Sequence, residues 1–181
     1  RWTKLQSKSM KIPQLSIFSE SDDVDVELHT LEKLLNKAKK QFSFQGVVHG
    51  GIQSVFQKEK FETICSKFDL VPFAPLWGSD PHSYMRNLID SNFEFILTAV
   101  SSAGLDGSWL GRQISKYDIS VLHKLSQKFG FNLNFEGGEA ETFVVDCPLF
   151  TKPIQIVQSE KNWDGYRGRF EIVDAKLNCN A

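Results

Sequence analysis

The fold of this chain is decided by residues 46–57, which read GVVHGGIQSVFQ. The first four residues predict a short buried strand, and the glycine pair Gly50-Gly51 ends it. Ser54 and Gln57 then stand at the spacing of a capping box, which predicts a helix that runs to about Phe68. A strand, a glycine turn and a helix in this order indicate an α/β fold.

Helices and strands alternate around this stretch. The spacing of apolar side chains and the helix start and stop residues predict helices over residues 2–11, 21–40, 80–91 and 118–129. Strands are predicted over residues 14–18, 71–74 and 93–100, and after residue 133 over 141–146, 154–159 and 169–177. The alternating part predicts a mostly parallel α/β sheet, the end is rich in strands, and a boundary is expected near residues 75–80.

Length, charge and cysteine content narrow the class of protein. The chain has 181 residues, enough to bury a core without disulfide bonds, and its net charge of −1 argues against a dedicated nucleic-acid binder. It has no apolar run of about 20 residues for a membrane span, and its first residues lack the apolar core of a secretion signal. The three cysteines form no CxxC pair and the four histidines are scattered, so no metal cluster is predicted and a reduced, cytoplasmic protein is expected.

Gly50 and Gly51 are the first candidate binding residues. Glycines let a ligand approach the backbone closely, and the free amides at the start of the next helix favour an anion. Ligands of α/β sheets bind at the carboxyl ends of strands, which is where this turn is expected. A plain tight turn would have the same sequence, so both interpretations stand.

Residues 136–142 read EGGEAET and place three carboxylates, Glu136, Glu139 and Glu141, around a glycine pair. Crowded carboxylates raise one another's pKa or bind a cation, and either property suits proton transfer or Mg²⁺ binding. The apolar strands on both sides favour a functional turn, and a solvated acidic turn is the alternative.

Residues 101–112 form a glycine-containing loop after a predicted buried strand, where α/β proteins place binding loops. Arg112, at the end of this loop, can hold a phosphate or a carboxylate with two hydrogen bonds. A surface ion pair is the alternative role for this arginine.

Six segments in this order resemble the diphthine–ammonia ligase family of PP-loop ATP pyrophosphatases. They are residues 50–57 (GGIQSVFQ), 73–77 (FAPLW), 99–106 (AVSSAGLD), 109–112 (WLGR), 136–143 (EGGEAETF) and 146–150 (DCPLF). The resemblance covers nearly the whole chain, and the acidic glycine motif is very specific. It implies an α/β fold with a partial Rossmann-like (HUP-type) parallel sheet and helices, followed by a smaller α+β C-terminal domain. Residues 1–76 would be the end of the nucleotide-binding PP-loop domain, and residues 77–181 the substrate or catalytic domain with the EGGE motif.

The resemblance implies ATP-dependent amidation of diphthine, a modified histidine of translation elongation factor 2, to diphthamide. AMP joins the diphthine carboxylate, pyrophosphate leaves with the help of Mg²⁺, and ammonia attacks the acyl-adenylate. The implied cofactors are ATP and Mg²⁺, and the implied partners are the diphthine-bearing elongation factor and ammonia. Neither DNA nor a membrane is an expected partner, and a homo-oligomer is left open.

The resemblance also implies roles for individual residues. Gly50, Gly51, Ser54 and Gln57 would line the nucleotide site. Glu136, Glu139 and Glu141 would be catalytic, as base, cation ligand or orienting group. Gly137, Gly138, Thr142, Asp106 and Arg112 would bind substrate.

The chain departs from the family pattern at two places. The family's phosphate loop, Ser-Gly-Gly-Lys-Asp-Ser, is absent, and we expect a fragment that begins beyond it, with a strand edge and an apolar sheet face exposed. The family's Tyr-Gln followed by Arg is here Phe56-Gln57 and Lys60, which removes a two-pronged contact. Two alternatives are a PP-loop enzyme that modifies tRNA, and a non-enzymatic nucleotide-binding or interaction module that has lost the phosphate loop.

Overall fold

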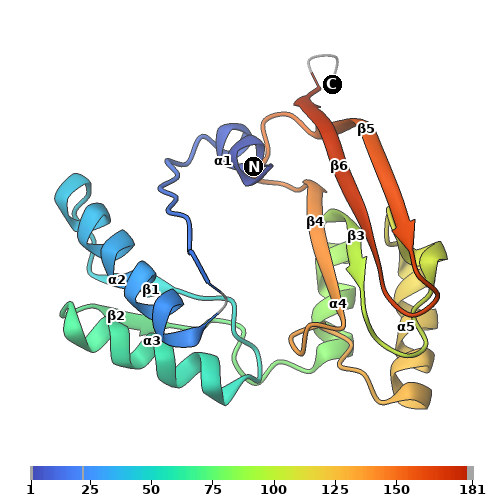
Figure 1. The fold of residues 1–181 in the computed structure, drawn as a ribbon, viewed down its shortest axis with the longest axis horizontal. Coiled ribbons are helices and arrows are strands. Elements are labelled where there is room, and N and C mark those ends of the chain that lie inside the picture. Colours follow the sequence, from blue (N-terminus) through green and yellow to red (C-terminus); the bar gives the residue numbers. More distant parts are fainter. Residues whose placement is uncertain (1, 22, 179–181) are drawn as a thin grey trace. The chain divides into compact units, whose positions relative to one another are not determined.

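Figure 1 shows the computed structural model of the chain, which describes residues 2–21 and 23–178. The chain divides into two compact units. One unit comprises residues 14–79, and the larger one comprises residues 1–13 together with 80–181. Both units combine helices with strands, so the predicted α/β fold class is confirmed.

In the unit of residues 14–79, two helices pack on a two-stranded parallel sheet. The elements are α2 (Val24–Gln41), β1 (Gly46–Val48), α3 (Val55–Lys67) and β2 (Val71–Phe73). The strands pair from Gly46↔Val71 to Val48↔Phe73, which is the parallel pairing expected of a partial Rossmann-like sheet. The buried core comprises Leu35, Ile64, Cys65 and Leu70.

Within the described residues, helices cover one face of this sheet. Val47 packs against the core, whereas Val48, Val71 and Phe73 are 68%, 65% and 59% exposed. Neighbouring side chains of a strand point to opposite faces, which explains the alternation. The expected exposure of an apolar sheet face is confirmed. The strand predicted at residues 46–49 is present as β1, but the prediction that it is buried is wrong.

Residues 14–18 form neither a helix nor a strand, so the strand predicted there is wrong. Ile17 and Phe18 are exposed. A strand needs a hydrogen-bonding partner, and β1 and β2 pair with each other rather than with this segment.

The larger unit contains a four-stranded antiparallel sheet in the order β4-β3-β6-β5. Its elements are α1 (Thr3–Met10), α4 (Pro81–Asp90), β3 (Glu94–Val100), the 3-10 helix η1 (Gly107–Trp109), α5 (Lys116–Phe129), β4 (Ala140–Asp146), β5 (Ile154–Trp163) and β6 (Gly168–Leu177). The alternating pattern placed β3 among parallel strands, but β3 pairs antiparallel with both β4 and β6. The long β5–β6 hairpin supplies one neighbour of β3, a pairing that local periodicity does not reveal.

The sheet carries an apolar core on each face. Leu97 belongs to the cluster that includes residues of α4 and α5, and its neighbour Ile96 belongs to the cluster that includes Trp2 of the N-terminal segment. Trp2 donates its indole hydrogen to the Ile172 carbonyl at 2.8 Å, and the Gln6 amide donates to the Val144 carbonyl at 3.0 Å. These contacts join residues 1–13 to residues 80–181, whereas the sequence-based division grouped them with residues 14–76.

The helix boundaries follow from local capping. Asp80 caps α4 by accepting a hydrogen bond from the Ser83 amide at 2.8 Å, and Gly130 ends α5 with a φ of +78°. Helix α5 begins two residues earlier than predicted because Ser115 and Asp118 form a reciprocal capping box. None of the helices in the described part of the chain has the length and hydropathy of a membrane span.

Candidate functional site

The EGGE motif lies in a tight connection between α5 and β4. Phe135 has a φ of +62° and Gly138 a φ of +80°, so the backbone reverses twice within a few residues. The Phe135 amide donates to the Asn132 carbonyl at 2.9 Å, and the Gly138 amide donates to the Phe135 carbonyl at 3.1 Å. A bulky residue in the left-handed region costs conformational energy, and residues with such strain cluster at functional sites. This turn is therefore a candidate site.

Glu139 folds back over the turn that contains it. Its Oε1 accepts a hydrogen bond from the Asn132 amide at 2.9 Å, and its Oε2 is buried with no hydrogen-bond partner among the described residues. A Cβ on Gly137 would lie 2.7 Å from Oε1, so a larger residue there would require the Glu139 side chain to shift. The carboxylate of Glu139 therefore holds the turn in its present conformation.

Glu136 points to a different environment. Its Oε2 accepts a hydrogen bond from the Asn134 side-chain amide at 3.4 Å, and Asn134 in turn accepts one from the Glu136 backbone. Burial raises the pKa of Tyr84 on α4, and the negative charge of Glu136 raises it further. Glu136 and Glu139 thus have separate partners within one turn.

Ser101 joins the end of β3 to the same turn. Its hydroxyl donates to the Gly138 carbonyl at 2.6 Å, and its amide donates to the Glu139 carbonyl at 2.9 Å. These two bonds fix the backbone of the motif against the central strand of the sheet.

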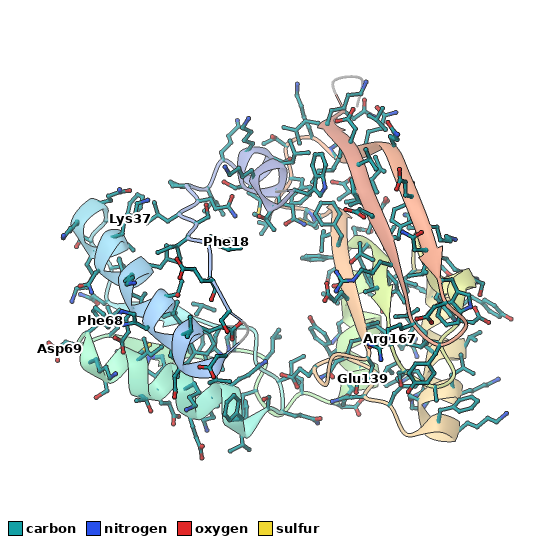
Figure 2. All side chains as sticks on the ribbon, viewed as in Figure 1. Phe18, Lys37, Phe68, Asp69, Glu139 and Arg167 are labelled. Atoms are coloured by element: carbon teal, nitrogen blue, oxygen red, sulfur yellow. The ribbon has the colours of Figure 1, made fainter. Side chains whose placement is uncertain are left out.

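A pocket of about 580 Å³, here called the hairpin pocket, opens next to this turn. Ser101, Gly138 and Glu141 line one side of it, and Trp163, Arg167 and Arg169 of the β5–β6 hairpin line the other. Figure 2 labels Glu139 and Arg167, which lie at the same end of the sheet. Of the three motif glutamates, Glu141 is the one whose side chain is exposed and lines this pocket.

The base of the hairpin pocket is a row of three residues on adjacent strands. Ala99 of β3 pairs with Glu141 of β4 on one side and with Arg169 of β6 on the other. Cross-strand partners project from the same face of a sheet, so a carboxylate and a guanidinium flank a small methyl group. The row brings opposite charges to one site without forming an ion pair between Glu141 and Arg169.

Sequence reasoning missed Trp163, Arg167 and Arg169. The turn at residues 162–165 was predicted, but no local feature of the sequence indicates that the hairpin lies beside β3 and the EGGE motif. The available indication was two aromatic residues and two arginines within seven residues around a predicted turn.

The remaining predicted substrate residues lie outside the lining of the hairpin pocket. Thr142 on β4 is exposed and pairs with Leu97. Arg112 forms an ion pair with the buried Asp118 and lies over the Trp109 ring at 5.0 Å. Asp106 caps η1 by accepting hydrogen bonds from the amide and the hydroxyl of Ser108.

Replacing Arg112 by methionine is expected to lower the free energy of unfolding by about 2 kcal/mol, because the buried Asp118 carboxylate loses its counter-charge. Arg86 on α4 is exposed, so Arg86→Met is a matched control with an expected change below about 0.5 kcal/mol. Urea unfolding followed by tryptophan fluorescence measures both. Equal stability of the two variants would mean that Arg112 has no structural role here.

Asp106→Asn is expected to reduce the loss of stability in acid. The Ser108 hydroxyl and amide hydrogen bonds lower the pKa of Asp106 below its ordinary 3.8. The ionised carboxylate therefore stabilises the fold at pH values above its ordinary pKa of 3.8. This stabilisation is lost as the pH falls through the lowered pKa. Asparagine keeps the acceptor but does not titrate, so thermal unfolding of the two proteins from pH 6 to about pH 3 should diverge below about pH 4. Parallel curves would contradict this assignment.

In the unit of residues 14–79, the predicted nucleotide residues surround the start of α3. The Ser54 hydroxyl accepts a hydrogen bond from the Gln57 amide at 3.4 Å, which confirms the predicted helix cap. The Gly51 amide donates to Nδ1 of the buried His49 at 3.3 Å, and the His49 ring stacks on Phe61 at 4.5 Å. A Cβ on Gly50 would meet nothing within 4 Å, so the backbone there is open to a ligand.

A groove lies beside these residues. Gln57 also lines a mostly apolar groove of about 200 Å³ between α2 and α3 with Phe56 and Lys60. No group of three or more His, Cys, Asp or Glu side chains among residues 2–21 and 23–178 is placed to hold a metal ion. Mg²⁺ that arrives with ATP takes its ligands mainly from phosphate oxygens and water, so it needs no such group.

The family model described as diphthamide synthase C-terminal domain matches residues 80–177. The diphthine–ammonia ligase of Rattus norvegicus is 34% identical over 157 residues, which are 86% of this chain and 57% of that protein. The protein of the same name from Danio rerio is 37% identical over 144 residues, 79% of this chain and 55% of that protein. The one from Schizosaccharomyces pombe is 29% identical over 143 residues, 79% of this chain and 23% of that protein. The chain thus spans little more than half the length of the vertebrate relatives.

Proposed function

Because this chain belongs to the family of the diphthamide synthase C-terminal domain, we propose that the complete protein is a ligase that amidates diphthine on translation elongation factor 2 to diphthamide. ATP would supply the activation by transferring AMP to the diphthine carboxylate, and Mg²⁺ would neutralise the departing pyrophosphate. The residues described here supply the site where the activated carboxylate meets ammonia.

The observation that supports this proposal most is the position of Glu141 opposite two arginines in the hairpin pocket. A carboxylate attracts the ammonium ion and takes its proton, which frees the nitrogen lone pair for attack. Arginines hold the carboxylate end of the substrate next to that nitrogen. The two reacting groups are thereby brought together on one face of the sheet, which lowers the entropy cost of the reaction.

Glu139 and Glu136 have a supporting role in this proposal. Glu139 holds the Asn132 amide, and Ser101 holds the Gly138 carbonyl, so the wall of the pocket at Gly138 has one conformation. Glu136 adds negative charge beside Tyr84. Both residues position the turn, and Glu141 is the group proposed to contact the reacting nitrogen.

Gly50, Gly51, Ser54 and Gln57 are proposed to contribute to the ATP site. The open backbone at Gly50 and the start of α3 suit an anionic group. Phosphate binding would also need the family's Ser-Gly-Gly-Lys-Asp-Ser loop, which the sequence of residues 1–181 does not contain.

The proposal is tested by the products made from ATP. The complete protein is incubated with ATP, Mg²⁺, ammonium and elongation factor 2 that carries diphthine, and the nucleotide products are separated by chromatography. AMP and pyrophosphate that form in proportion to the elongation factor support the proposal. Formation of AMP with tRNA instead would favour a tRNA-modifying enzyme, and the absence of turnover with either would favour a binding module.

A further inference from the structure

We propose that His82 and His123 form a binding site for a divalent transition-metal ion such as Zn²⁺, which joins helix α4 to helix α5. This pair, here called the histidine site, is separate from the residues that line the hairpin pocket, and the inference does not rest on the proposed ligase activity. It is carried by the contact between the two imidazole rings, by their free nitrogens and by a carboxylate beside both rings.

The packing of the two helices holds the histidines in contact. His82 stands three residues before the buried Met85 on α4, and His123 follows a buried leucine on α5. Met85 and that leucine, Leu122, belong to one core cluster, which fixes the helices against each other. The ring centroids of the two histidines are 4.3 Å apart, and the ring planes make an angle of 35°. Two metal-binding side chains from different helices are therefore together before any ion binds.

The nitrogens of both rings are available to a metal ion. Each of the two histidines is partly exposed, and neither ring forms a hydrogen bond or an ion pair with another group within residues 2–21 and 23–178. By contrast, Nδ1 of His29 lies 3.9 Å from a carboxylate oxygen of Glu32, and Nδ1 of His49 accepts a backbone hydrogen bond. A neutral imidazole has one nitrogen with a free lone pair, which is the atom that binds a metal. The outer torsion of histidine is broad, so each ring can turn this lone pair toward a shared ion while the helices stay in place.

A carboxylate beside the histidine site supplies negative charge. Asp80 caps α4, and its Oδ1 accepts a hydrogen bond from the Ser83 amide at 2.8 Å. Hydrogen bonds from Ser83 are the main reason that the pKa of Asp80 is lowered, and the charges of the two imidazoles lower this pKa further. The carboxylate thus lies near both rings. No group of three ligands is placed to hold a metal in the described part of the chain, so Asp80 acts through its charge and through water rather than as a third ligand.

The type of ion follows from the two imidazoles. Imidazole nitrogen suits Zn²⁺, Ni²⁺ and Cu²⁺, whereas Mg²⁺ prefers oxygen ligands and keeps several of its water molecules. The histidine site is therefore distinct from the Mg²⁺ that the proposed reaction takes up with ATP. Two protein ligands leave the other positions of the ion to water, so we expect a Kd of about 10 µM, much weaker than that of a structural zinc site with four protein ligands.

The test titrates the full chain with Zn²⁺, measures the affinity by calorimetry and follows the histidine ring signals by NMR. We expect Zn²⁺ to bind with a Kd of about 10 µM and to shift the ring signals of His82 and His123. The signals of His29 and His49 should stay in place. Mg²⁺ is the second probe and should leave all four histidine signals unchanged. Absence of Zn²⁺ binding, or equal shifts of the His82 and His123 signals with Mg²⁺, would overturn the proposal.

Histidine variants identify the ligands. His82→Gln and His123→Gln should each weaken Zn²⁺ binding by about 100-fold, because the ion loses one of its two protein ligands. His29→Gln is the matched control, since His29 lies in the unit of residues 14–79, and its replacement should leave the Kd unchanged. Zn²⁺ binding that persists in both His82→Gln and His123→Gln would place the ion elsewhere and contradict the assignment.

Asp80→Asn tests the carboxylate separately. Asparagine caps a helix as well as aspartate does but carries no charge, so α4 should keep its start while Zn²⁺ binds about tenfold more weakly. Thermal unfolding is measured for each variant with and without Zn²⁺. Without the ion the midpoints should equal that of the original chain, and Zn²⁺ should raise the midpoint of the original chain but not those of the two histidine-site variants. An equal rise in all of these proteins would show that Zn²⁺ does not act at the histidine site.

Discussion

Replacing Glu141 by glutamine is expected to lower the amidation rate of the complete protein by about 100-fold or more while leaving its stability unchanged. Glutamine has the shape of glutamate but does not accept a proton from ammonium. Glu141 is exposed in the hairpin pocket and accepts none of the side-chain hydrogen bonds that hold the EGGE turn. The fold should therefore tolerate the change, and the loss should appear in kcat.

Glu160→Gln is the matched control for this variant. Glu160 is an exposed glutamate on β5 that pairs with Glu171 and does not line the hairpin pocket. Its replacement should leave the rate within about twofold of the original, as surface substitutions usually do. Rates are measured as amide formed on the elongation factor, and thermal unfolding is measured for both variants. A Glu141→Gln enzyme with the original kcat would remove this carboxylate from the proton-transfer step.

Replacing Gly168 by alanine is expected to destabilise the larger unit by about 3 kcal/mol, which is at the upper end of overpacking effects. A Cβ at this position would lie 2.4 Å from the Asn162 carbonyl oxygen and 2.9 Å from both Leu110 and the Trp163 ring. The carbonyl belongs to the backbone of the β5–β6 hairpin, so it cannot rotate away from the added methyl group as a side chain could. The hairpin must therefore shift, and with it Trp163, Arg167 and Arg169.

Gly50→Ala controls for the addition of a methyl group, because a Cβ there meets nothing within 4 Å and Gly50 does not have a positive φ. Its expected effect on stability is below about 0.5 kcal/mol. Urea unfolding gives the two free energies. A Gly168→Ala protein as stable as Gly50→Ala would mean that the fold does not depend on this close packing.

The elements with strong local sequence features were predicted correctly. The caps at Ser54, Asp80 and Gly130 each depend on one side chain or one glycine that acts on its own helix end. The EGGE motif was recognised from its carboxylates and glycines, and the Glu139 carboxylate folds over Gly137 within the same turn. Such features are local, so a single sequence is sufficient to find them.

The parts that depend on long-range pairing were not predicted. Ala99 lies between Glu141 and Arg169 because β3 pairs with two strands that are distant in sequence, and no periodicity within β3 indicates its neighbours. The hairpin residues of the pocket were missed for this reason. The packing of Trp2 on β6 is likewise a contact between residues 170 positions apart.

Two residues illustrate how sequence alone leaves alternatives open. Arg112 was consistent with anion binding and with an ion pair, and in the structure it contacts Asp118, which the sequence places six residues later. Phe18 was consistent with a strand, and it is 85% exposed because the segment finds no pairing partner in β1 or β2. In both cases the deciding partner is set by the tertiary fold.

The complete protein is proposed to join ammonia to the diphthine carboxylate. The most direct test of this proposal supplies the protein with ATP, isotopically labelled ammonium and diphthine-bearing elongation factor 2, and locates the label by mass spectrometry of the modified peptide. We expect the label in the amide of diphthamide, in an amount equal to the AMP that forms. An elongation factor that stays unlabelled while AMP accumulates, or label that appears without ATP, would contradict it.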